Sequence, residues 1–137
     1  FAARGPRGRD FPWGNLWNPH LANHGSLAHD PTDGTDGYLY LAPVGSFPDG
    51  ATPTGLLDMA GNAAEWVSDL FDLDDGGFGY PAASAVNPKG PTTGAYHVAR
   101  GGSWGDGAAW LRSAARSVSS AHRSPQIGVR CAYDVAP

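Results

Sequence analysis

The chain has 137 residues, enough for one domain with a modest core, and its 20 Gly and 12 Pro are far above average usage. Its formal charge of −4 is unevenly distributed, because the span from Asp10 to Pro88 holds 11 acidic residues and no Lys or Arg. This acidic field argues against nucleic acid as a partner, and no apolar run approaches the roughly 18 residues that a membrane span needs.

The sequence predicts a loop-rich fold. No window of about 11 residues carries apolar side chains at helical spacing. Five Trp, five Tyr and five Phe are available to supply the large buried surfaces that such a fold requires. The acidic half must be solvated, paired with the basic half, or neutralised by cations.

Three histidines lie close together near the start of the acidic half. His20 and His24 have the i, i+4 spacing that would place two ligands on one helical face, and His29 follows. Pro19 and Gly25 interrupt the segment, so we predict no helix there and no transition-metal site formed by these side chains.

An eight-residue turn from Asp58 to Glu65 has a carboxylate at each end and small residues between them. Calcium takes six to eight oxygen ligands from carboxylates and backbone carbonyls, and Gly and Ala let the carbonyls point inward. This turn is therefore a candidate calcium loop. A later acidic run is most simply a solvated helix end and turn; it consists of Asp69, Asp72, Asp74 and Asp75.

The segment Arg100–Trp104 has the sequence Arg-Gly-Gly-Ser-Trp. We predict a strand that enters a tight backbone approach, where paired glycines permit positive φ and Trp104 anchors beneath. Cys131 is the only cysteine, which excludes an internal disulfide, and we expect it to be a buried structural thiol.

Several motifs resemble the formylglycine-generating enzyme family, the sulfatase-modifying-factor domain, which has a C-type-lectin-like fold. They are Phe1–Gly5, Phe11–Gly14, Ala42–Pro48, Gly55–Trp66, Arg100–Trp104, Leu111–Arg116 and Ile127–Ala132. The resemblance implies an α+β, loop-rich fold of this type. It also implies that residues 1–137 are the C-terminal part of a single domain, completed by an N-terminal segment or another chain that covers its apolar surface. We expect a bacterial protein, and the sequence leaves its compartment open, extracytoplasmic included.

The oxidases of this family carry two copper-binding cysteines shortly after the Gly-Gly-Ser motif. Here the stretch from Trp104 to Trp110 contains no sulfur, and oxygen ligands are poor replacements for thiolates at cuprous ion. The resemblance therefore implies no copper and no formylglycine-generating activity. The same family uses arginines at the positions of Arg112, Arg116 and Arg130 for internal pairing, so we expect these to brace the fold.

The resemblance also implies two calcium sites. In the first, Asp58 and Glu65 give side-chain oxygens, while Gly61 and Ala63 act through their carbonyls. In the second, Asn23 and Asp36 give side-chain oxygens, while His24 and Tyr38 give main-chain ones. The alternative for the second site is that Asp33-Gly34 and Asp36-Gly37 are ordinary turn dipeptides.

Two irregular stretches, residues 105–110 and 117–126, are framed by Trp104, Leu111-Arg112 and Ile127-Gly128. They form a candidate recognition surface on a rigid scaffold. The surface residues are Ser103, Trp104, Asp106, Trp110, His122 and Arg123. The favoured function is a calcium-stabilised, non-catalytic domain that binds a peptide, protein or glycan, or serves as an accessory subunit. Two alternatives stay open: an iron-dependent oxidase whose ligands lie outside this chain, and a variable ligand-binding protein of the diversity-generating retroelement type.

Overall fold

The computed structural model describes residues 1–26, 33–71, 91, 93–119 and 123–133. Regular structure is sparse, as the composition predicts. Two 3-10 turns, η1 (Pro19–Leu21) and η2 (Pro48–Gly50), precede the strands β1 (Ala64–Phe71) and β2 (Tyr96–Arg100). The short helix α1 (Ala108–Leu111) and the strands β3 (Ser117–Ser119) and β4 (Ile127–Gly128) follow.

The four strands form one mixed sheet in the order β3-β2-β1-β4. β2 pairs antiparallel with both β1 and β3, whereas β4 runs parallel to β1. The register between β1 and β2 shifts between Trp66 and Leu70, which marks an irregularity of the bulge type in β1. Asp69 lies in this strand, so the prediction of a helix end at this position is wrong; the other aspartates of that run lie outside the described residues.

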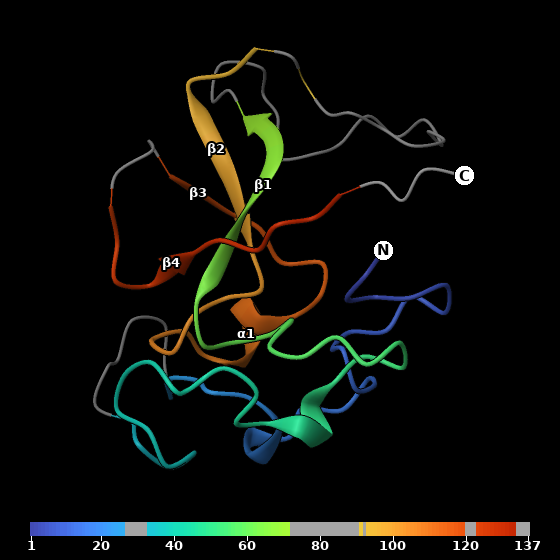
Figure 1. Ribbon diagram of the computed structural model, residues 1–137, viewed down its shortest axis with the longest axis vertical. Helices are drawn as coiled ribbons and strands as arrows, with labels where there is room; N and C mark the ends of the chain where they lie inside the picture. Colours follow the sequence, from blue (N-terminus) through green and yellow to red (C-terminus); the bar gives the residue numbers. More distant parts are fainter. Residues whose placement is uncertain (27–32, 72–90, 92, 120–122, 134–137) are drawn as a thin grey trace.

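Figure 1 shows the loops of the first 60 residues gathered at the end of the sheet where β1 begins, with α1 beside this junction. The buried core of this region consists of Phe11, Ala22, Ala60 and Leu111. Trp13 and Trp17 pack against it, and the Phe11 and Trp13 rings are stacked with centroids 5.3 Å apart. The core therefore joins the start of the chain to α1.

The turn η1 explains why the spaced histidines form no helical face. Asn18 caps it by accepting a hydrogen bond from the amide of His20, and Pro19 occupies the first position. The turn ends at Leu21, which confirms that no helix spans the pair. His20 is exposed, whereas His24 is buried against Trp17 with ring centroids 5.1 Å apart.

Several large apolar side chains are exposed, among them Leu16 at 82%, Val44 at 88% and Tyr133 at 88%. Cys131 is also exposed, so the prediction of a buried thiol is wrong. It follows β4 in a segment whose side chains from residue 129 to 133 all lie at the surface. None of the helices in the described part of the chain has the length and apolarity needed to cross a membrane.

Candidate binding cavity and cation loops

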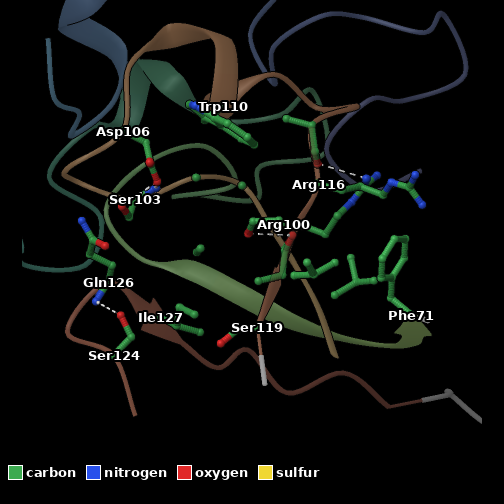
Figure 2. A pocket seen from close by; sticks show the side chains of 18 residues that line it. Phe71, Arg100, Ser103, Asp106, Trp110, Arg116, Ser119, Ser124, Gln126 and Ile127 are labelled. Carbon is green, nitrogen blue, oxygen red and sulfur yellow. Dashed lines mark hydrogen bonds between the residues drawn. The ribbon is translucent and has the colours of Figure 1, made fainter. Parts of the chain in front are cut away.

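A cavity of about 520 Å³ opens between the sheet and the loop that carries α1. Figure 2 shows Asp106 and Trp110 at one end of it and Ile127 and Ser119 toward the other. Its walls also include Ser103, Ser124 and Gln126, together with apolar side chains of β1, β2 and β3. A mostly apolar hollow with a few polar groups is the usual form of a ligand site.

Ser103 and Asp106 form the rigid polar corner of this cavity. Ser103 is fully buried, and its hydroxyl donates to Asp106 Oδ2 at 2.7 Å. The Ser103 amide donates to the same oxygen at 2.9 Å, and the Gly105 amide donates to Ser103 Oγ at 3.3 Å. These local bonds fix the loop because a side chain and the backbone share one acceptor.

The preceding glycines make this corner possible. β2 ends at Arg100, and Gly101 and Gly102 follow with φ of 94° and 70°. A Cβ on Gly102 would lie 2.9 Å from Leu111 Cδ1 and 3.0 Å from the Trp110 carbonyl oxygen. The predicted strand and tight backbone approach are thus confirmed.

The predicted recognition residues divide into two groups. Ser103, Asp106 and Trp110 line the cavity, and Trp110 is 41% exposed. Trp104 instead packs beneath it, 8% exposed, where its indole donates to the Pro125 carbonyl at 3.2 Å. Arg123 is exposed and does not line the cavity, while His122 lies outside the described residues.

Several further residues line the cavity. Gln126 and Ser124 reach it from the loop before β4, and Val118 reaches it from β3. All three lie in the predicted recognition stretch 117–126, although the sequence does not single them out within it. Arg100 lies outside both predicted stretches and also lines the cavity, and its guanidinium donates to the carbonyls of residues 113, 114 and 115.

The structure brings together the four residues predicted for the second calcium site. Asp36 Oδ2 accepts from the amide of His24 at 2.6 Å, and Asp36 Oδ1 accepts from the amide of Tyr38 at 2.8 Å. Asn23 is 1% exposed and donates through Nδ2 to the Tyr40 carbonyl at 2.8 Å. We refer to Asn23–His24 and Asp36–Tyr38 as the Asn23–Asp36 loop.

Two buried side-chain atoms of the Asn23–Asp36 loop, Asn23 Oδ1 and His24 Nε2, lack a hydrogen-bond partner. Asn23 Oδ1 is buried and accepts no hydrogen bond, which ordinarily costs about 1–3 kcal/mol. An amide oxygen next to a carboxylate-bearing loop is the ligand type that calcium takes. The residues present therefore fit a calcium ion, with the Asn23 and Asp36 oxygens as its side-chain ligands.

The first predicted calcium site fits less well. Both Glu65 oxygens accept from Arg130 Nε, at 2.9 and 2.8 Å, and Arg130 Nη2 also donates to the Leu57 and Asp58 carbonyls. Asp58 Oδ2 accepts from the Gly45 amide at 2.8 Å. Hydrogen bonding to Glu65 raises the pKa of Arg130, so its positive charge persists. Gly61 and Ala63 lie in the same turn, but an arginine already neutralises its Glu carboxylate.

Clusters of three or more His, Cys, Asp or Glu side chains arranged for a metal do not occur among the described residues. A calcium ion in either predicted loop would therefore depend on amide and main-chain oxygens in addition to carboxylates. Arg130 braces the fold as predicted, and Arg112 donates to the Ala109 carbonyl at 3.1 Å. Arg116 lines the cavity.

Residues 1–135 match the sulfatase-modifying factor enzyme 1-like domain. The chain belongs to this family. The formylglycine-generating enzyme of Bos taurus is 37% identical over 97% of this chain and 36% of its own length. The enzyme of the same name from Thermomonospora curvata is 38% identical over 90% of this chain and 43% of its own length. The hercynine oxygenase of Mycolicibacterium smegmatis is 36% identical, with 93% and 28% covered. The chain thus spans less than half the length of these relatives.

Solved structures agree with this family assignment. PvdO from Pseudomonas aeruginosa superposes with a TM-score of 0.69 and 28% identity, covering 93% of this chain and 46% of PvdO. Treponema denticola variable protein 1 gives a TM-score of 0.65 at 24% identity, covering 93% and 42%, a likeness that shows the fold alone. The α+β, lectin-like fold of the formylglycine-generating enzyme type is therefore the fold of this chain.

Proposed function

We propose that this chain is a calcium-stabilised, non-catalytic binding domain that recognises a peptide, protein or glycan, or serves as an accessory subunit of a larger assembly. The observation that carries the proposal is the Ser103–Asp106 corner. In the copper oxidases of the family, the stretch after Gly-Gly-Ser supplies thiolates; here that stretch contains no sulfur, and its Asp106 carboxylate accepts a hydrogen bond from Ser103 of the motif. The only cysteine, Cys131, does not line the cavity. This arrangement supports recognition rather than copper chemistry.

Calcium has a structural role in this proposal. Asn23 Oδ1 and the Asp36 carboxylate would hold the ion and thereby order a segment that has little regular structure. The proposal extends to the Asp58–Glu65 turn, where calcium would have to displace Arg130 from Glu65. Such a displacement predicts weaker calcium affinity there than at the Asn23–Asp36 loop.

A covering partner completes the proposal. Leu16, Val44 and Tyr133 expose most of their apolar surface, and Val129 is 78% exposed. Exposed apolar surface of this extent favours contact with another segment of the protein or another chain. We propose that the N-terminal remainder of the domain, or a separate subunit, covers part of it.

Metal analysis of the purified full-length protein tests the function. Calcium bound without stoichiometric copper or iron is the expected result. The similarity to hercynine oxygenase favours a second candidate, an iron-dependent oxidase whose ligands lie outside this chain. Stoichiometric iron together with oxygen consumption would replace the first proposal by the second. Stoichiometric copper would contradict the prediction that the chain, which lacks the thiolate pair, binds no copper.

The binding role needs its own experiment. Glycan and peptide arrays probed with the full-length protein should give hits that the Trp110→Ala variant loses, because Trp110 presents the largest side chain to the cavity. A matched control is Asn15→Ala, which removes an exposed side chain that does not line the cavity. Hits that survive Trp110→Ala would place recognition elsewhere.

A further inference from the structure

Two hydrogen-bonded routes connect the Asn23–Asp36 loop to the Ser103–Asp106 corner of the cavity. In the first, two consecutive amides donate to different segments. The His24 amide donates to Asp36 Oδ2, and the next amide, that of Gly25, donates to the Asp106 carbonyl at 3.0 Å. Movement of the Asn23–Asp36 loop would therefore displace Asp106, whose side chain holds Ser103.

The second route passes through Asn62, a buried residue with φ of 64°. Its amide donates to the Asn23 carbonyl at 2.9 Å, and its own carbonyl accepts from the Trp104 amide at 2.9 Å. One residue thus links the Asn23 backbone to the segment that carries the Ser103–Asp106 corner of the cavity. Residues 23 and 104 are far apart in sequence, and Asn62 holds both.

The Asn62 side chain also determines how Asn23 is oriented. Asn62 Nδ2 donates to the Ala42 carbonyl at 3.2 Å, and its Oδ1 accepts from the Ala42 amide at 3.0 Å. This pairing turns Asn62 Oδ1 toward Asn23 Nδ2, 3.1 Å away. Both donor positions of Asn23 are then used, on Asn62 and Tyr40, and its Oδ1 is the oxygen left over.

We infer that Asn62 is a positioning residue that couples calcium at the Asn23–Asp36 loop to the Ser103–Asp106 wall of the cavity. The inference rests on the calcium role proposed above. With the ion bound, Asn23 Oδ1 and Asp36 are satisfied, and the Gly25 and Asn62 bonds hold the wall. Without the ion, a buried oxygen and a carboxylate lack a cation, and the loop opens and releases the wall. Calcium and a cavity ligand then bind with positive cooperativity, because coupling between two sites is reciprocal.

Amide hydrogen exchange on the full-length protein, with calcium ion as the only added ligand, tests the coupling. Calcium should slow exchange at Gly25 and also at Trp104, by a factor on the order of 5 to 150. Slower exchange confined to residues 23–25 and 36–38 would overturn the inference and leave the calcium proposal intact. No change in either segment would overturn both.

Variants separate positioning from general stabilisation. Asn62→Gly removes the side-chain amide while tolerating the positive φ, and it should weaken calcium affinity, measured by calorimetry, by roughly tenfold within the usual coupling range. It should also reduce the calcium response at Trp104, because the side chain that orients Asn23 Oδ1 is gone. Asn15→Ala, which removes an exposed asparagine that accepts only from the Asp10 amide, should leave both quantities unchanged.

If Asn62→Gly does not fold, Asp36→Asn provides the same decision, because it weakens a proposed ligand and leaves Asn62 in place. Calcium should then produce no slowing at Trp104. A persistent calcium response at Trp104 in Asp36→Asn would show that calcium acts on the cavity wall from elsewhere, which contradicts the inference.

Discussion

Arg130 holds Glu65 through both carboxylate oxygens, with the shortest contact, Nη2 to Oε1, at 2.7 Å. The same guanidinium reaches the carbonyls of Leu57 and Asp58, so one arginine closes the start of the turn onto its end. The side chains of Arg130 and Glu65 are 37% and 23% exposed. The pair is thus a brace at the surface, and solvent screens much of its electrostatic attraction.

The Arg130→Met variant should lower the free energy of unfolding by no more than about 1 kcal/mol, because exposed ion pairs contribute little. Urea denaturation measures this. Arg112→Met is the matched control, since Arg112 is exposed and donates to the Ala109 carbonyl of its own turn, and should change stability less. A loss above about 3 kcal/mol would show that the pair is desolvated in the full-length protein.

The same Arg130→Met variant also tests the Asp58–Glu65 turn as a calcium loop. Removal of the guanidinium frees the Glu65 carboxylate, so calcium affinity at this turn should rise. Calorimetric titration of the variant against the unaltered protein provides the comparison. An unchanged number of bound ions and unchanged affinities would restrict calcium to the Asn23–Asp36 loop.

Gly61 occupies a position where both space and conformation demand glycine. Its φ is 77°, and an added Cβ would collide with the Asn23 carbonyl. Gly61→Ala should therefore destabilise the fold by about 1–2 kcal/mol of backbone strain plus the cost of the collision. Gly55→Ala, at a φ of 81° with no atom within 4 Å of the added Cβ, should show the strain alone. Equal unfolding free energies for the two variants would contradict the close approach.

Leu111 anchors α1 in the core with no exposed surface. Leu111→Ala should lower the unfolding free energy by about 2–5 kcal/mol, as expected for a large-to-small change in a packed interior. Leu39→Ala, at a side chain 54% exposed, should change it by less than about 0.5 kcal/mol. Similar losses at both positions would contradict the anchoring role of Leu111.

The sequence was sufficient to predict the fold class, the scarcity of helices and the tight turn at Gly101-Gly102. The fold class follows from motifs that resemble the family, and the other two follow from local signals, namely glycine pairs and prolines. The predicted burial of Cys131 and the predicted helix end at Asp69 were both wrong. Residue type alone favours burial for cysteine and solvated turns for aspartate. Asp69 instead lies in β1, and Cys131 lies past the end of β4 in an exposed segment.

The candidate site was predicted in part. Ser103, Asp106 and Trp110 follow a recognisable motif and line the cavity together. Gln126 and Val118 lie in the predicted stretch 117–126 but were not singled out, because their place depends on pairing between segments distant in sequence. Asn62 lies in the Gly55–Trp66 motif, but nothing in that motif indicates its hydrogen bonds to three other segments.

Thermal unfolding of the full-length protein with and without calcium tests the central claim most directly, in parallel with Asp36→Asn and Asp49→Asn. Asp49 is exposed in η2 and is not one of the proposed ligands, so it serves as the control. Calcium should raise the melting temperature of the unaltered protein and of Asp49→Asn, and the rise should be lost or much reduced in Asp36→Asn. Identical melting temperatures with and without calcium in the unaltered protein would contradict the account.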